Sequence, residues 1–190
     1  LLGSAVAAVG DIDGDGVADY AAGAPENGYP IPYYDNGYVR VWSGRTGLPL
    51  YFWKSDKFPS EFGQVILPIG DVDRDGRPDI VATAYLGTFR DGSVGFARLY
   101  SGGTGKLLRT LRGRNGDEHF GMSAAAVGDV DGDQVPDVAI GVVNPFNFGR
   151  TGRVYVYSGR TGAIVRELVG TAGPVMFGRS MCPVGAPHGD

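Results

Sequence analysis

Apolar and polar residues alternate along short segments of the chain. The segment 38–43, YVRVWS, has the period of two that is typical of a half-buried β-strand. The segment 4–10, SAVAAVG, is small and apolar, as expected of an inner strand with strands on both sides. Two further segments, 20–24 and 48–53, complete the set. The first sixty or so residues therefore predict four short strands.

The same set of four segments recurs twice along the chain. The later strands are expected at 64–70, 80–84, 95–101 and 106–112, and again at 122–128, 138–142, 153–158 and 163–169. A fourth unit starts near Phe177 and contains about one strand. We expect an all-β protein made of three complete four-stranded antiparallel units and the first strand of a fourth. The unit boundaries are expected at about 1–60, 61–118, 119–175 and 176–190.

Three sequence markers repeat in a fixed order. Asp-x-Asp-x-Asp begins at residues 11, 71 and 129, which gives a period of about 60 residues. A Phe-Gly pair precedes the second and third of these motifs and recurs at 177–178, with Leu2-Gly3 in its place in the first unit. A turn of the form Ser-Gly-x-Thr-Gly follows, at 43–47, 101–105 and 158–162. Four strands repeated with this period are typical of β-propeller blades.

Propellers usually close with about 4–8 blades. Since this chain has three blades and part of a fourth, we expect the remaining blades to come from the same longer chain or from self-association of copies. Three blades alone would leave long sheet faces uncovered.

Composition agrees with a turn-rich β protein. The 190 residues include 33 Gly, and 17 of the 21 acidic residues are Asp, a composition that favours turns over helices. The net charge is −4, with no cluster of Lys and Arg, which argues against nucleic acid as a partner. No apolar run approaches the ~18 residues of a membrane span. The single cysteine, Cys182, lies in an apolar context and is expected to be buried.

The Asp motifs predict metal sites. Each nine-residue loop has carboxylates at positions 1, 3, 5 and 9 and can add the backbone carbonyl of position 7. An all-oxygen set of this size suits Ca²⁺, whereas Mg²⁺ prefers more water, and Zn²⁺ prefers His and Cys. The expected ligands are Asp11, Asp13, Asp15, Val17 and Asp19 in loop 1, Asp71, Asp73, Asp75, Arg77 and Asp79 in loop 2, and Asp129, Asp131, Asp133, Val135 and Asp137 in loop 3.

The EF-hand shares the beginning of this motif but does not fit. It requires a bidentate Glu at position 12 and flanking helices. Position 12 is Ala22, Ala82 or Ile140 here, and the flanking segments predict strands. Loop 3 differs from the others because Gln134 replaces Gly at position 6, where a positive φ is favoured. We expect three calcium sites, the third being weaker.

The Phe-Gly pair, the Asp loop and Gly23-Ala24-Pro25 together resemble the FG-GAP repeat of integrin α-subunit propellers and of many bacterial surface proteins. The simplified Val-, Gly- and Asp-rich repeats are more typical of bacterial members. The resemblance implies a non-enzymatic, secreted or cell-surface module that serves adhesion, ligand recognition or structural assembly. It also implies that calcium rigidifies the first hairpin of each blade on the lower face.

The resemblance places ligand contacts on the opposite face, in loops that include 26–36, 86–92 and 144–151. Aromatic residues in these loops suit a protein or glycan ligand. The candidates are Tyr29, Tyr33, Tyr34, Phe89, Phe146 and Phe148. The alternative is that these side chains only pack over the blade edges.

Two other functions stay open at this point. One is a calcium-dependent enzyme of the polysaccharide lyase kind, for which Tyr33, Tyr34, Lys54 and Lys57 are the candidate groups. The other is a purely structural building block of a surface layer or filament.

Overall fold

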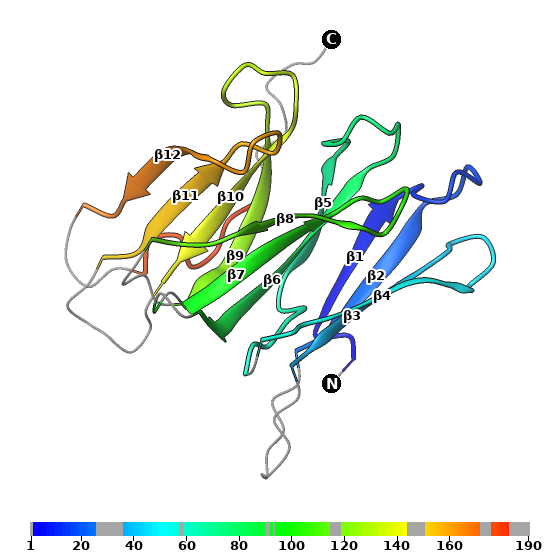
Figure 1. Ribbon diagram of the computed structural model, residues 1–190, viewed down its shortest axis with the longest axis horizontal. Helices are drawn as coiled ribbons and strands as arrows, with labels where there is room; N and C mark the ends of the chain where they lie inside the picture. The colour runs from blue at the N-terminus through cyan, green and yellow to red at the C-terminus, as the bar shows by residue number, and fades with distance from the viewer. Residues whose placement is uncertain are drawn as a thin grey trace.

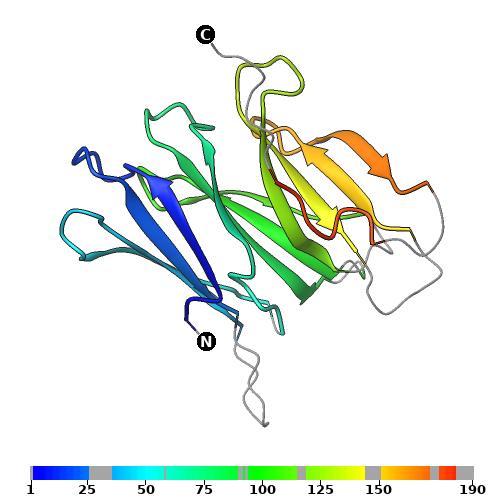
Figure 2. The same ribbon diagram turned by 180° about the vertical axis from the view of Figure 1, so that it is seen from behind.

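The computed structural model describes residues 2–25, 36–57, 59–89, 92, 94–114, 119–143, 151–171 and 176–182. Within these ranges the chain is all-β, with twelve strands and no helix. Consequently no helix in the described part of the chain is long and apolar enough to cross a membrane. Three four-stranded groups stand side by side, in chain order (Figures 1 and 2). The predicted all-β propeller-blade class is confirmed.

Each group of strands is an antiparallel meander that we call a blade. Blade 1 contains β1 (Ala5–Gly10), β2 (Asp19–Ala24), β3 (Tyr38–Trp42) and β4 (Pro49–Lys54). Blade 2 contains β5 (Ile66–Gly70), β6 (Asp79–Thr88), β7 (Val94–Tyr100) and β8 (Leu107–Leu111). Blade 3 contains β9 (Phe120–Gly128), β10 (Asp137–Val142), β11 (Arg153–Tyr157) and β12 (Ile164–Val169). In each blade the strands pair with their neighbours in sequence order.

The twelve strands predicted in the three complete units agree with these bounds to within about two residues, with one exception. β6 continues to Thr88, which pairs with Val94 of β7 after an irregularity that begins at Ala84. The expected loop over 86–92 is therefore partly wrong. The pairing of β6 with β7 continues past the predicted end of β6, because Val94 at the start of β7 lies opposite Thr88. The strand expected at the start of the fourth unit is not found in residues 176–182, and the rest of that unit lies outside the described residues.

The Phe-Gly pair is the connection between blades. Phe62 and Phe120 are fully buried, and each makes a parallel bridge to a glycine of the preceding blade, Gly37 and Gly95 respectively. The backbones approach so closely that a Cβ on Gly23 of β2 would lie 2.0 Å from the carbonyl oxygen of Gly63. A side chain at either end of this contact would push the blades apart.

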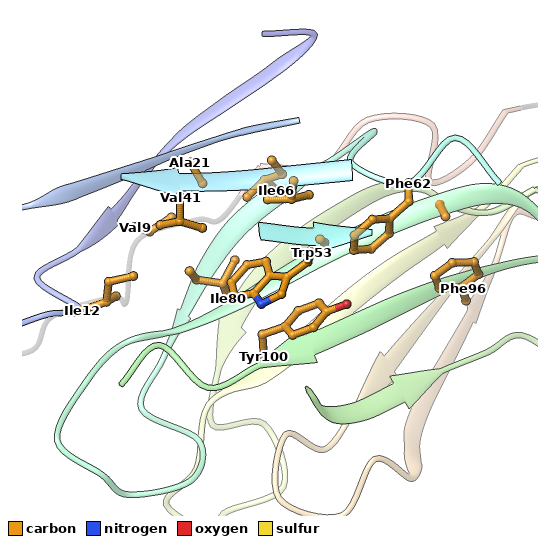
Figure 3. Close-up of a cluster of buried hydrophobic side chains, with 13 residues drawn as sticks. Val9, Ile12, Ala21, Val41, Trp53, Phe62, Ile66, Ile80, Phe96 and Tyr100 are labelled. Atoms are coloured by element: carbon orange, nitrogen blue, oxygen red, sulfur yellow. The ribbon is translucent and has the colours of Figure 1, made fainter. Parts of the chain in front are cut away.

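The buried core lies between the blades. Trp53 of β4 stacks on Tyr100 of β7, with ring centroids 4.1 Å apart and planes 10° from parallel. The indole Nε1 donates a 2.9 Å hydrogen bond to the carbonyl of Gly105. Phe62 and Ile80 belong to the same buried cluster (Figure 3). This arrangement explains why the sequence has large aromatic residues near the ends of strands.

The start of the fourth unit lies against blade 3. A Cβ on Gly152 would be 2.0 Å from the carbonyl oxygen of Phe177, the contact expected for a Phe-Gly pair. Residues 176–182 form turns, with no strand in this described stretch. Cys182 is exposed, so the prediction that it is buried is wrong: its apolar sequence neighbours would bury it only within a strand of a packed blade.

Replacement of Trp53 by Ala should strongly destabilise the protein. It removes an aromatic stack and an inter-blade hydrogen bond and leaves a cavity, so the free energy of unfolding should fall by about 3–5 kcal/mol. Urea unfolding measures the change. The neighbouring Phe52 is 54% exposed and is the matched control, because Phe52→Ala should cost about 1 kcal/mol or less. Equal losses from the two variants would contradict this account of the blade interface.

Candidate metal centres

The three Asp loops occupy equivalent places in the three blades. Loop 1 (11–19) joins β1 to β2, loop 2 (71–79) joins β5 to β6, and loop 3 (129–137) joins β9 to β10. All three lie at the edge of the blades that is uppermost in Figure 1. Position 1 follows the last residue of the first strand, and position 9 is the first residue of the second strand. Two rigid strands therefore fix the two ends of each loop.

The carboxylate at position 1 accepts hydrogen bonds from the backbone of its own loop. Asp11 Oδ1 accepts from the N–H groups of Gly14 (2.6 Å) and Asp15 (3.1 Å), and Oδ2 accepts from Gly16 (2.9 Å). Desolvation acts to raise the pKa of Asp11, but these three N–H donors, together with the positive charge of Arg77, outweigh it and lower the pKa overall. In loop 3 the corresponding donors are Gly132, Asp133 and Gln134, and they likewise lower the pKa of Asp129.

Positive φ angles help to curl the loops. Position 4 has a φ of 83° at Gly14, 65° at Arg74 and 82° at Gly132. At position 6 the φ is positive in all three loops, including 65° at Gln134, so the left-handed conformation expected there is present without glycine. Loop 3 thus keeps the shape of loop 1 at the cost of a strained Gln.

The carboxylate at position 9 is buried and connects two parts of the blade. Asp19 Oδ2 accepts hydrogen bonds from Ile12 N–H (2.9 Å) and Asp13 N–H (3.3 Å), and Oδ1 accepts from Gly44 N–H (2.8 Å). The equivalent bonds tie Asp79 to Val72 (2.8 Å) and Gly102 (2.9 Å), and Asp137 to Val130 (2.7 Å) and Gly159 (3.0 Å). Each Asp loop is thus fastened to the Ser-Gly-x-Thr-Gly turn of its own blade.

Sequence reasoning did not connect this turn with the Asp loop. The three turn glycines, Gly44, Gly102 and Gly159, belong to the third repeated marker. The recurrence of that marker with every Asp loop was the available signal, since two motifs that repeat together can share a structural contact.

Burial of the position 9 carboxylates has an electrostatic cost. Desolvation raises the pKa of Asp79 to about 6, and it also raises the pKa of Asp137. The carboxylates at position 3 add to this effect, since Asp73 and Asp131 repel the negative charges of Asp79 and Asp137. A cation at the loop would relieve both effects.

Each loop brings carboxylates from three positions close enough to hold one ion. Ligand oxygens of each group lie within 4.8 Å of one another, and the groups are Asp11, Asp13 and Asp15, then Asp71, Asp73 and Asp79, and then Asp129, Asp131 and Asp137. The donors are all oxygens, so the set fits a hard cation such as Ca²⁺ and not Zn²⁺. The carbonyls of Val17, Arg77 and Val135 and the side chains of Asp19, Asp75 and Asp133 lie outside these groups and remain predicted ligands.

Of the six predicted ligand-face aromatics, Phe89 alone falls in the described part of the chain. Tyr29, Tyr33, Tyr34, Phe146 and Phe148 lie outside the described residues. The Phe89 ring meets Phe96 edge to face at 5.8 Å, with Arg112 over it at 4.6 Å and Lys57 at 5.2 Å. Phe89 is partly buried against the core of blades 1 and 2, which is the packing that the alternative interpretation expects.

Comparison with family models agrees with the repeat geometry. The model described as FG-GAP repeat matches residues 2–42, and the model described as FG-GAP-like repeat matches residues 71–140. Together these matches span more than half of the chain. The chain belongs to the FG-GAP repeat family.

Integrin α-subunits are among the relatives of this FG-GAP protein. Integrin alpha-4 of Xenopus laevis is 33% identical over 154 residues, which is 74% of this chain and 14% of the integrin. Integrin alpha-V of Gallus gallus is 29% identical over 169 residues, or 84% of this chain and 15% of the integrin. The chain therefore spans about one seventh of the length of these relatives.

A solved structure has a similar fold. The crystal structure of rhamnogalacturonan lyase YesW aligns with a TM-score of 0.53 over 87% of this chain and 34% of the lyase chain. The sequence identity is 17%, so this similarity bears on the fold alone.

Two carboxylates of loop 1 should respond differently to removal when the protein is free of metal. Asp19→Ala leaves the N–H groups of Ile12 and Gly44 without their acceptor in a buried site, so the free energy of unfolding in EDTA should fall by about 2 kcal/mol. Asp13 is exposed and accepts one hydrogen bond, from Asp15 N–H, so Asp13→Ala should change stability in EDTA by about 0.5 kcal/mol or less. Denaturant unfolding in EDTA measures both, and an Asp13→Ala loss equal to that of Asp19→Ala would refute the distinction.

Proposed function

We propose that this FG-GAP protein is a calcium-binding, non-enzymatic propeller module of an extracellular or cell-surface protein, serving adhesion, ligand recognition or structural assembly. The observation that carries the proposal is the threefold repetition of one carboxylate arrangement. Loops 1, 2 and 3 have the same spacing and the same place at one edge of the blades, and in each the N–H groups of positions 5 and 6 donate to the position 1 carboxylate.

Calcium would hold each hairpin closed. When bound, the ion supplies positive charge to carboxylates that otherwise repel one another. The chain's own residues shape the loop: position 1 organises the N–H groups, and position 9 fixes the loop to the neighbouring turn. Because such a site forms only in the folded protein, binding free energy adds to the free energy of unfolding.

The partner is a protein or glycan that binds the face opposite the Asp loops. The kinship with integrin subunits supports a protein ligand, association with other chains and an extracellular location. The ligand face itself, and assembly with further blades of a longer chain or with other copies, remain part of the proposal. Phe89 and the loop aromatics outside the described residues remain the candidates for contact.

An enzymatic function has less support. Of the candidate lyase groups, Lys57 pairs with Asp56 at 3.2 Å and covers the ring of Phe89, so its charge is already compensated. Lys54 has other interactions, and Tyr33 and Tyr34 lie outside the described residues. Cleavage of an acidic polysaccharide, followed by the ultraviolet absorbance of unsaturated products, would favour the lyase alternative.

Calcium removal should lower the melting temperature. At a free calcium concentration 100 times Kd, each site adds about 2.7 kcal/mol to stability. Loss of three such sites from a chain of this size should lower Tm by at least about 10 °C. Differential scanning calorimetry in excess EDTA, and again after calcium is restored, measures the effect.

Two controls make the calorimetry specific. Magnesium at the same concentration should restore less of the lost stability, because it demands a tighter octahedral shell. The triple variant Asp13→Ala, Asp73→Ala, Asp131→Ala should fold in EDTA but lose most of its response to calcium. A melting curve that is the same in EDTA and in calcium would refute the structural role of the ion.

A further inference from the structure

The three Asp loops share one geometry but differ in the arginines that contact them. In blade 1, Arg45 Nε lies 3.3 Å from Asp15 Oδ2, and its Nη2 donates to the Asp15 carbonyl. In blade 3, Arg160 Nε lies 3.3 Å from Asp133 Oδ2 and makes the same second contact, to the Asp133 carbonyl, at 2.5 Å. Both arginines occupy the variable position of the Ser-Gly-x-Thr-Gly turn.

Loop 1 has a second arginine, which comes from blade 2. Arg77 Nη1 lies 3.7 Å from Asp11 Oδ2. The guanidinium reaches this place because position 4 of loop 1 is glycine: a Cβ on Gly14 would lie 1.8 Å from Arg77 Nη2. The next pair of blades cannot repeat the contact, since Val135 of loop 3 stands where Arg77 stands in loop 2.

Among the described residues, loop 2 has no such arginine partner. The variable turn position in blade 2 is Gly103, whose Cα is packed so tightly that a Cβ would lie 2.3 Å from Asp75 Oδ2. Asp75 accepts a hydrogen bond from the uncharged Ser101 hydroxyl at 3.2 Å, as Asp15 does from Ser43 at 3.4 Å, but no arginine takes the place beside it that Arg45 takes beside Asp15. Arg74 is exposed, and within the described ranges it makes no ion pair with a carboxylate. In the described part of the chain, two arginines therefore pair with loop 1, none with loop 2 and one with loop 3.

A guanidinium beside a ligand carboxylate opposes the binding of a cation there. It reduces the negative electrostatic potential at the site, and it occupies a carboxylate oxygen that could otherwise coordinate the ion. A unit positive charge several ångström from a divalent ion in a largely solvated site changes its affinity by about tenfold. The same guanidinium also offsets the repulsion between the carboxylates when calcium is absent. Calcium binding therefore relieves less repulsion in a loop that has an arginine partner.

We propose that these arginines grade the calcium affinities of the three loops: loop 2 binds most tightly, loop 3 follows, and loop 1 is the weakest. This inference rests on the calcium binding proposed above. It differs from the order expected from the sequence, in which loop 3 is the weakest because of Gln134, by placing loop 1 below loop 3. The affinity of loop 1 would then depend on a residue of the neighbouring blade, because Arg77 belongs to loop 2 while its side chain pairs with Asp11 of loop 1.

Residue-specific NMR can follow each loop separately. The backbone N–H of Gly14, Gly76 and Gly132 each donates to the position 1 carboxylate of its own loop, and these are the reporters. In a titration of the full chain with Ca²⁺ alone, the Gly76 signal should reach its midpoint first, Gly132 next and Gly14 last. Successive midpoints should be separated by about tenfold in free calcium.

Removal of one arginine should change the calcium midpoint of only the loop that it contacts. Arg77→Ala should lower the Gly14 midpoint by about tenfold and leave the Gly132 midpoint in place. Arg160→Ala should lower the Gly132 midpoint by about tenfold and leave the Gly14 midpoint in place. Arg166→Ala is the matched control, because Arg166 is exposed on β12 and should change none of the three midpoints.

The outcomes separate the two proposals. If no loop responds to calcium, the proposed function fails and this inference fails with it. If the loops respond but Gly14 is the first to reach its midpoint, or if Arg77→Ala leaves the Gly14 midpoint unchanged or raises it, the grading is refuted while calcium binding stands. Midpoints in the stated order that shift only with the matching arginine support the grading.

Discussion

The buried carboxylate at position 9 is the interaction on which each blade depends. Asp19, for example, accepts hydrogen bonds from two segments that are far apart in the blade: the start of its own loop and the turn between the third and fourth strands. One side chain thus connects both hairpins of a four-stranded sheet. Because it is buried, its charge must be compensated, and the exposed carboxylates of the same loop make compensation by a cation favourable.

Close approach of backbones is the second constraint, and it acts between blades instead of within them. The Phe-Gly pair buries an aromatic ring and at the same time brings its backbone against a glycine of the preceding blade. The Asp loops and the Phe-Gly pairs lie at different places along the blade, so hairpin closure and blade packing are set by separate contacts. This separation explains why the repeat has several short markers and not one long motif.

The sequence predicted the strands and the Asp loops because both depend on local spacing. A period of two marks a strand such as 38–43, and alternate Asp residues mark a curled loop. The contacts that were missed join distant segments: the turn glycine Gly44 with Asp19, and Arg77 with Asp11. The extension of β6 to Thr88 and the exposure of Cys182 were missed for the same physical reason, since each depends on a neighbouring strand being present or absent.

The distribution of charge is also clearer from the structure than from the composition. Twelve of the 17 Asp residues belong to the three loops, so most of the acidity behind the net charge of −4 is concentrated at one edge of the blades. If the three proposed calcium ions bind, they add six positive charges and the net charge becomes +2. The ion pairs of Arg45, Arg77 and Arg160 lie at this same edge. The loops are thus partly neutralised even without the ion, and the composition alone would give a misleading picture of an acidic surface.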